Sequence, residues 1–548
     1  MPELVLGPVL RYVGEREATI WVETDAPCEV EVLGRTASTF RVDGHNYAIV
    51  PIEGLEPGQS YEYQVALDGN RRWPAPDSDF PPSAIRTVDP RETLRIVFGS
   101  CRVAVPHRPP YTLSKDEDPR GREIDALYGL AMRMKARPRV DWPHLLLSIG
   151  DQIYVDEDSP ETRAFIRSRR DPSRPPGLAV LDFEEYTRLY WESWGEPAIR
   201  WLFSTVGLAT IFDDHDVHDD WNTSIAWLEE MRSKDWWATR IESALMSYWV
   251  YQHLGNQSPR ELAENELLAQ VREAEDGGAI LRRWAARADR GSNGSRWSYT
   301  RDVGGVRIIV FDSREGRVLG HGPRRMADDI EWERVVGRAT GDFDHLLLVD
   351  SLPFLLVPAF HHLEAWNEAV CAGAWGAWGK GWGEKLRRAL DLEHWAAFNC
   401  SFRRLERLLV EVGSGSRGNP PATIIGLGGD VHHAYLAEVG FRRDAGVESA
   451  VYQAVCSPFR NPLDRHERMT VRAGDSPAAG RIAHVLARTA HVPDPEIRWR
   501  LVQQPTFDNQ FATLELAGRN ALLKIERTVP DDRPDGHTIK TSLERRLA

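Results

Sequence analysis

The sequence lacks features that are typical of several large protein classes. It holds only five cysteines among 548 residues, and none of them forms a CxxC pair, which excludes a disulfide scaffold. No stretch approaches the roughly 20 apolar residues that a membrane-spanning helix needs. The first residues, "MPELVLGPVLRYVGERE", contain neither a basic stretch followed by an apolar core nor a twin arginine. We therefore expect a cytoplasmic protein without a membrane partner.

Basic charge is also scarce. The chain has 68 lysines and arginines against 82 acidic residues, a net charge of −14. Non-specific nucleic-acid binding needs a basic face, so a nucleic acid is not an expected partner. A small phosphate-bearing substrate is compatible with this charge, because bound metal ions reverse the local field. Nothing in the composition indicates an oligomeric state.

The pattern of apolar residues divides the chain into three parts. Residues 1–88 contain short runs of alternating apolar and polar residues, such as "ATIWVET" and "CEVEVLG", which predict an antiparallel β-sandwich of immunoglobulin or fibronectin type. The proline-rich stretch 71–92 is typical of a linker. Residues 94–460 contain strongly apolar runs of strand length separated by helical patterns, which predict a buried sheet covered by helices. Residues 461–548 add strands and helices that complete or cover this second domain.

Five of the apolar runs end in side chains that can bind metal or phosphate. The runs are "RIVFGSCR", "LLLSIGDQIY", "LATIFDDHD", "RIIVFDSR" and "TIIGLGGDVHH". The side chains at their ends are Cys101, Arg102, Asp151, Tyr154, Asp213, Asp214, His215, Asp312, Arg314, Asp430, His432 and His433. In open α/β sheets, ligand sites form at the carboxyl ends of the strands. The repetition on five strands therefore favours one shared metal site.

Each of these residues also has an ordinary structural explanation when it is taken alone. An aspartate after a strand is usually a turn residue or a helix cap. Tyr154 would usually be a core aromatic residue, and Cys101 a small buried hydrophobic one. The acidic run "ATIFDDHDVHDDWN" at 209–222 is, by composition, a solvated loop. It is the joint occurrence of these features that favours a metal site.

Taken in order, the motifs "FGSCR", "GDQIY", "DDHDVHDDW", "FDSR" and "GGDVHH" resemble those of the alkaline phosphatase D (PhoD-like) family of the metallophosphoesterase superfamily. The resemblance covers about residues 94–460, and the β-rich segment ahead of them resembles the N-terminal module of that family. It implies an α+β fold, in which a four-layer αββα sandwich follows an all-β domain. The ligands of such a fold lie on loops at the strand ends.

The resemblance also implies a binuclear metal site. The ligands of the first metal would be Cys101, Asp151, Tyr154 and His432. This metal would resemble the ferric ion of purple acid phosphatases, and anionic thiolate and phenolate ligands suit Fe³⁺. Asp151 would bridge to a second metal, completed by Asp214 and Asp430. Their oxygens suit a hard divalent ion, which is calcium by family resemblance, with manganese, magnesium or zinc as alternatives.

The implied activity is the hydrolysis of phosphoric monoesters, diesters or both. A metal-bound hydroxide would attack phosphorus in line, and the metals would neutralise charge on the equatorial oxygens. His215 would stabilise the phosphate or protonate the leaving alkoxide. Arg102 and Arg314 would grip phosphate oxygens, with a structural salt bridge as the alternative for both. Two further functions stay open: a phosphotriester or nucleotide-anhydride hydrolase on this fold, and a partner-binding protein with a structural metal.

Several residues near the motifs have no assigned role. The strand in "LLLVDSLPF" ends in Asp350 and Ser351, where the wider superfamily often supplies a histidine. The histidines whose place in the site is open are His218, His361, His362 and His433. The stretch "GAWGAWGKGWGEK" at 373–385 alternates tryptophan with glycine. It predicts a mobile loop that covers a substrate or, as the alternative, tryptophans that pack against the domain.

Overall fold

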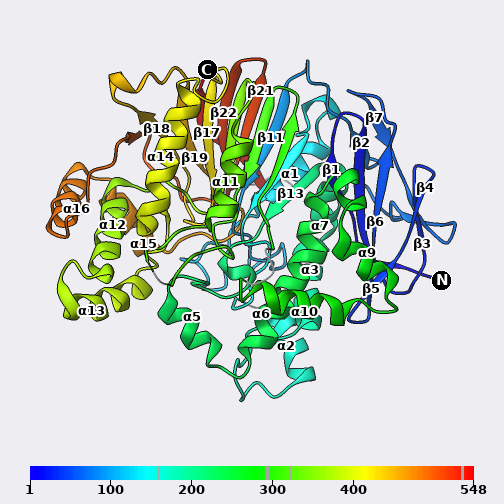
Figure 1. The fold of residues 1–548 in the computed structure, drawn as a ribbon. Coiled ribbons are helices and arrows are strands. Elements are labelled where there is room, and N and C mark those ends of the chain that lie inside the picture. The colour runs from blue at the N-terminus through cyan, green and yellow to red at the C-terminus, as the bar shows by residue number, and fades with distance from the viewer. Residues whose placement is uncertain (158, 292–294, 321, 532–535) are drawn as a thin grey trace.

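The alternating N-terminal segment forms a β-sandwich, drawn in blue in Figure 1. One sheet has the order β1 (Leu4–Val13), β2 (Glu17–Thr24), β6 (His45–Glu53) and β5 (Phe40–Val42). The other has the order β4 (Arg35–Ser38), β3 (Glu29–Val32), β8 (Val65–Leu67) and β9 (Asn70–Trp73). Ile20 and Val22 point into the core between the sheets, whereas Trp21, from the opposite face of β2, packs against the rest of the chain. The computed structural model describes residues 1–157, 159–291, 295–320, 322–531 and 536–548.

The proline-rich stretch 71–92 is not a free linker, and this expectation from the sequence is wrong. The stretch contains strand β10 (Ala84–Arg86), which pairs antiparallel with β7 (Ser60–Glu62). The side chains of Trp73 and Ile85 are buried in the sandwich core. These two apolar anchors hold the segment against the sandwich despite its prolines.

The larger part of the chain is built on two sheets. The six-stranded sheet has the order β13 (Gly207–Ile211), β12 (Leu145–Ile149), β11 (Leu94–Gly99), β21 (Gln510–Ala517), β22 (Asn520–Pro530) and β23 (His537–Arg546). The seven-stranded sheet has the order β14 (Tyr299–Val303), β15 (Val306–Val310), β16 (His345–Val349), β17 (Thr423–Gly428), β19 (Ala450–Val455), β18 (Tyr435–Gly440) and β20 (Arg498–Leu501). Phe98 and Phe511 of one sheet share a core with Val310 and Leu427 of the other. The sheets therefore pack face to face.

Helices cover the outer faces of both sheets. Helix α1 (Ala126–Lys135) lies against β21–β23, with α4 (Pro197–Thr205) beside it. On the seven-stranded sheet, Trp332 of α11 (Asp329–Arg338) and Leu409 of α14 (Asn399–Gly413) pack with Leu348 of β16. The layers thus run helix, sheet, sheet, helix. This is the α+β fold class expected from the sequence, preceded by its all-β domain.

The remaining helices lie between and around these layers. They are α2 (Pro160–Arg169), α3 (Phe183–Trp194), α5 (Ile225–Arg232), α6 (Trp237–Ser247), α7 (Leu254–Asn256), α8 (Pro259–Ala263), α9 (Glu266–Glu273), α10 (Gly278–Ala288), α12 (Pro358–Ala372), α13 (Gly376–Ala389), α15 (Arg465–Gly474) and α16 (Pro477–Thr489). Within the described residues, none of the helices combines the length and the apolar character needed to cross a membrane.

The tryptophan- and glycine-rich stretch 373–385 is helical from Gly376 onward, so the expectation of a mobile loop is wrong. This helix, α13, packs closely on α12 through its glycines. A Cβ added at Gly383 would lie 2.9 Å from Sγ of Cys371 and 3.2 Å from Cγ1 of Val370. Glycine is a poor helix former, but here the close helix–helix packing that it permits outweighs that preference.

Candidate metal centre

The predicted metal ligands meet where strands of both sheets end. Strands β11, β12 and β13 are parallel neighbours, so the residues that follow them, among them Cys101 and Asp151, lie at one edge of the six-stranded sheet. Asp430 and His432 follow β17 of the other sheet. The two edges approach closely at Gly429, where an added Cβ would lie 2.4 Å from Oγ of Ser100. Only glycine permits this contact, which brings the ligands of the two sheets together.

Four of the predicted ligands have a left-handed backbone conformation. The φ angles are 58° at Cys101, 49° at Asp151, 62° at Asp430 and 52° at His432. This conformation is uncommon for residues other than glycine, and strained backbone of this kind gathers at functional sites. The surrounding structure therefore holds these side chains in directions that an unconstrained strand end would not choose.

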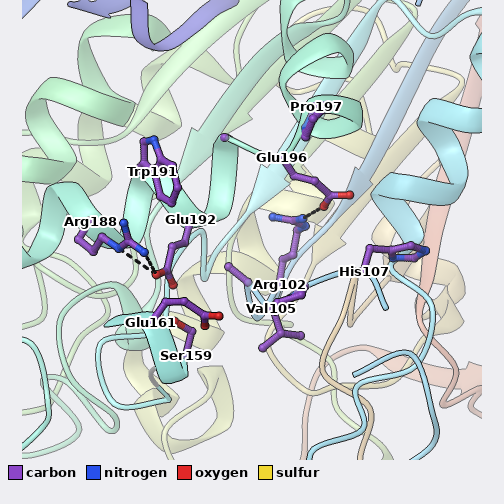
Figure 2. Close-up of a pocket in the computed structure, with 13 residues that line it drawn as sticks. Arg102, Val105, His107, Ser159, Glu161, Arg188, Trp191, Glu192, Glu196 and Pro197 are labelled. Carbon is purple, nitrogen blue, oxygen red and sulfur yellow. Dashed lines mark hydrogen bonds and ion pairs between the residues drawn. The ribbon is translucent and has the colours of Figure 1, made fainter. Parts of the chain in front are cut away.

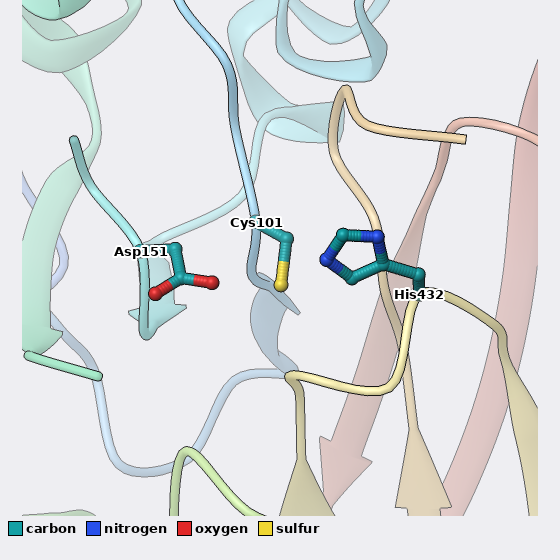
Figure 3. Close-up of side chains that lie close together, drawn as sticks. All are labelled: Cys101, Asp151 and His432. Carbon is teal, nitrogen blue, oxygen red and sulfur yellow. The ribbon is translucent and has the colours of Figure 1, made fainter. Parts of the chain in front are cut away.

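In the first group of candidate ligands, Cys101 and Asp151 are buried and His432 is half-buried. Ligand atoms of Cys101, Asp151 and His432 all lie within 4.8 Å of one another (Figure 3). The hydroxyl of Tyr154 donates a hydrogen bond to Oδ2 of Asp151 at 3.1 Å. Burial, followed by the nearby carboxylates of Asp151 and Asp430, raises the pKa of the Cys101 thiol well above its usual range. A thiolate at this place therefore needs a cation beside it.

The second group consists of carboxylates. Oxygens of Asp151, Asp213 and Asp214 lie within 4.8 Å of one another, and all three residues are buried. Oδ1 of Asp151 and Oδ2 of Asp213 are buried without a hydrogen-bond partner in the described structure. Burial, and then the neighbouring carboxylates, raises the pKa of Asp151, although His215 opposes this. Such a set of buried acidic oxygens fits a divalent cation.

Among the described residues, Asp430 belongs to neither group of mutually close ligand atoms, and it is held by a histidine that lies outside the motifs. Nε2 of His394 lies 3.0 Å from Oδ2 of Asp430, and Nδ1 lies 2.7 Å from Oε1 of Glu364. Burial opposes the charged imidazolium, but the two carboxylates outweigh it and raise the pKa of His394 well above its usual range. Sequence reasoning missed this pair, because His394 follows a helix rather than a strand.

Arg314 lies inside the acidic cluster and is fully buried. Its guanidinium donates to Oδ1 of Asp213, to Oε1 of Glu393 at 2.6 Å and to Oδ1 of Asp214 at 3.2 Å. Another of its contacts is Oδ1 of Asp430, at 3.6 Å. Every guanidinium nitrogen thus faces a carboxylate. Arg314 balances and orients the ligands, which agrees with the salt-bridge alternative for this residue.

His215 lies at the open side of the cluster. Its ring stacks on that of Tyr154 with 4.5 Å between the centroids, and about a fifth of its side chain (21%) is exposed. Nδ1 lies 3.4 Å from Oδ1 of Asp156. Burial opposes the imidazolium, but Asp214 and Asp156 outweigh it and raise the pKa of His215 well above its usual range. The two carboxylates therefore favour the protonated form of this ring at the edge of the cluster.

Comparison with known proteins agrees with this geometry. Residues 124–272 match the profile of the PhoD-like phosphatase family. The chain contains a PhoD-like phosphatase domain. Its first 85 residues match a domain of unknown function (DUF7800). No curated protein matches the chain.

The chain as a whole also has the fold of a solved protein, described as "Structure of PhoD". That structure superposes with a TM-score of 0.60 at 11% identity, over 99% of this chain and 92% of the other. The family match, together with this shared fold, supports a phosphoesterase. The family resemblance seen in the motifs is confirmed. Of the predicted ligands, Asp151, Tyr154 and Asp214 lie inside the matched segment, and the fold brings Cys101 and the residues after β17 to them.

The side chain of Arg102 is directed away from the candidate metal ligands. Its Nε donates to Oδ2 of Asp125 at 2.8 Å, and another nitrogen donates to the carbonyl of Ser193 at 2.5 Å. Glu196 lies 3.6 Å away. Arg102 and Glu196 line a cavity of about 340 Å³, and Trp191 lines the same cavity (Figure 2). The structure thus places Arg102 in a buried ion pair, the structural alternative, and not beside the acidic cluster.

None of the four unassigned histidines belongs to either ligand group among the described residues. Nδ1 of His218 donates a hydrogen bond to the carbonyl of Asp219 at 2.8 Å. His361 packs between the rings of Phe402 and Trp499, and His362 contacts His484. His433 stacks on Tyr435. Asp350 likewise has a structural role, since it accepts hydrogen bonds from Ser313 and from Trp395.

Proposed function

We propose that this chain is a metal-dependent hydrolase of phosphoric esters, a phosphomonoesterase, a phosphodiesterase or both, with a binuclear metal site. The observation that carries the proposal is the buried carboxylate group of Asp151, Asp213 and Asp214 next to the thiol and imidazole of Cys101 and His432. Two carboxylate oxygens in it are buried without a hydrogen-bond partner in the described structure. Removing such oxygens from water is unfavourable unless a cation binds them.

The ligand set is divided by its chemistry. Cys101, Asp151, Tyr154 and His432 would hold the first metal, for which Fe³⁺ is the proposed ion. Asp151 would bridge to the second metal, which Asp214 and Asp430 would also hold. Asp213 is added to this group because its carboxylate lies close to those of Asp151 and Asp214. Calcium is the proposed second ion by family resemblance, and manganese, magnesium and zinc are the alternatives. When bound, such ions lower the pKa of a water molecule and neutralise negative charge on phosphate.

The other residues of the site position ligands or move protons. Arg314 holds Asp213 and Asp214 in place, and His394 does the same for Asp430. His215 carries a proton at the open side, where it protonates the alkoxide as the ester bond breaks. Its stacking on Tyr154 fixes the direction of the ring. A small phosphate ester is thus the proposed substrate.

The proposal is tested by metal analysis of the purified protein and by hydrolysis of mono- and bis-(p-nitrophenyl) phosphate. We expect iron with a divalent ion, a visible colour from tyrosinate-to-iron charge transfer, and turnover. Asp151→Asn should abolish metal retention. Asp125→Asn is the matched control, because Asp125 is also buried and ion-paired but lies outside the cluster. Colourless protein that stays inactive after metals are added would refute the site.

A further inference from the structure

Helix α13 and its N-cap residue carry tryptophans that the protein core covers only in part. Trp375 is 37% exposed, Trp378 77% and Trp382 41%. Their spacing of three and four residues places them on one side of the helix. The rings of Trp375 and Trp382 also contact that of Trp366 on α12, so Trp378 is the most exposed of the three. Trp378 and Trp382 stack in parallel, with 6.3 Å between the ring centroids. Large apolar side chains gathered in this way mark an interaction surface.

The same helix is basic, although the chain as a whole is strongly acidic. The segment Gly376–Ala389 contains four basic residues and one acidic residue, while the whole chain has a net charge of −14. Lys380 and Lys385 are exposed, and neither makes an ion pair with any residue that the structure describes. Tryptophan together with unpaired lysine is the composition of segments that lie at the surface of an anionic membrane.

Helix α13 is connected to the candidate metal centre through the segment that follows it. Arg388 of α13 pairs with Glu230 of α5 at 2.8 Å, and Glu384 accepts a hydrogen bond from Ser224 at the start of α5. Figure 1 shows α13 and α5 along the same lower edge of the molecule. Beyond α13, the chain passes through the exposed Leu390 and then reaches His394, which contacts Asp430.

We propose that α13 docks the protein on an anionic lipid bilayer. Trp378 and Trp382 enter the interface between headgroups and acyl chains, Lys385 on the same side of the helix contacts anionic headgroups, and Lys380 adds positive charge to the helix. This surface attachment needs no membrane-spanning segment, and it differs from the expectation, drawn from the sequence, of a protein without a membrane partner. A second copy of the chain suits the patch less well, because a two-fold contact through α13 would bring the lysines of both copies together.

Sedimentation of the full-length protein with lipid vesicles tests the proposal. One set of vesicles contains phosphatidylcholine alone, and the other contains equal parts of phosphatidylcholine and phosphatidylglycerol. We expect binding to the anionic vesicles that weakens as salt is added. The double variant Trp378→Ala/Trp382→Ala and the double variant Lys380→Glu/Lys385→Glu should each bind at least about tenfold more weakly.

Two control variants carry the same substitutions elsewhere on the surface. Trp191→Ala removes an exposed tryptophan of α3, and Lys540→Glu reverses an exposed lysine of β23. Both should bind vesicles like the wild type, and circular dichroism should show that all variants fold. The proposal is overturned if the wild type ignores anionic vesicles, if the α13 variants bind them equally well, or if the tryptophans instead mediate self-association without lipid. The vesicle lipids are themselves phosphodiesters, so the same sedimentation with Asp151→Asn, which should lack metal, separates docking through α13 from binding at the proposed metal site: vesicle binding that persists in this variant is independent of the proposed catalysis.

Discussion

One histidine links the stability of the chain to pH at the contact between the sandwich and helix α3. Nδ1 of His45, on β6, lies 3.0 Å from Oε1 of Glu23, and Nε2 lies 2.7 Å from Oε2 of Glu184 on α3. Burial opposes the imidazolium, but the hydrogen bonds to the two carboxylates outweigh it and raise the pKa of His45 from 6.5 to about 9. The charged ring therefore joins the two parts of the molecule.

The raised pKa of His45 determines how the stability of the protein changes with pH. Because the folded protein holds the proton more tightly than the unfolded chain, the stabilisation is fully present below pH 6.5 and is lost as the pH rises through about 9. Each pKa unit corresponds to about 1.4 kcal/mol, so the shift is worth about 3 kcal/mol of unfolding free energy. The estimate applies to a side chain that is 23% exposed and hence mostly shielded from solvent.

Urea denaturation between about pH 6 and pH 10 compares the wild type with His45→Gln. The variant should be less stable by about 3 kcal/mol at the low end of this range, and the two curves should converge at the high end. His484→Gln is the matched control. His484 also lies 2.7 Å from a carboxylate, that of Asp494, but the pair is more exposed and lies in another part of the chain. Parallel pH profiles for wild type and His45→Gln would show that the reasoning is wrong.

Three further predictions concern the metal centre. His215→Ala should keep the metals but lose about 10²- to 10⁴-fold in turnover of esters with poor leaving groups; full activity on these esters in a steady-state assay would exclude the acid role. His394→Asn should lower metal affinity by about 10- to 100-fold, measured by competition with a chelator, because Asp430 loses its partner; unchanged affinity would contradict the positioning role. Gly429→Ala should destabilise the protein by about 1–3 kcal/mol in thermal unfolding, since the new Cβ would lie 2.4 Å from Oγ of Ser100. A variant as stable as the wild type would show that the two loops can separate freely.

Much of the scaffold could be predicted because its signals are local. The run "LRIVFG" is apolar except for Arg95, and it forms β11, buried between a helical layer and the second sheet. Glycine before a polar residue in "SIGD" marks the turn that places Asp151 at the strand end. By contrast, β11 pairs antiparallel with the distant C-terminal strand β21. The sequence of neither strand predicts this pairing, because the pairing of distant strands depends on the whole fold.

Helix α13 shows that a local sequence pattern can also predict the wrong secondary structure. Its glycines predict a loop by intrinsic propensity, yet they are the residues that let the helix pack on Val370 and Cys371. The same limit applies to His394, whose contacts with Asp430 and Glu364 join segments that are far apart in the chain. Such interactions depend on packing that no single segment encodes.

By itself, the sequence determined which strands exist and which side chains follow them, since alternation, apolar runs and turn residues act over a few residues. The tertiary structure alone decided what each of those side chains does. In the acidic run 209–222, Asp213 and Asp214 lie with Asp151 in the group of buried carboxylates, whereas Asp216 accepts a hydrogen bond from the backbone of Asp213. Likewise Arg314 enters the cluster and Arg102 turns to Asp125. The direction of a side chain depends on the backbone angles and on distant neighbours, and these are settled only when the two sheets come together.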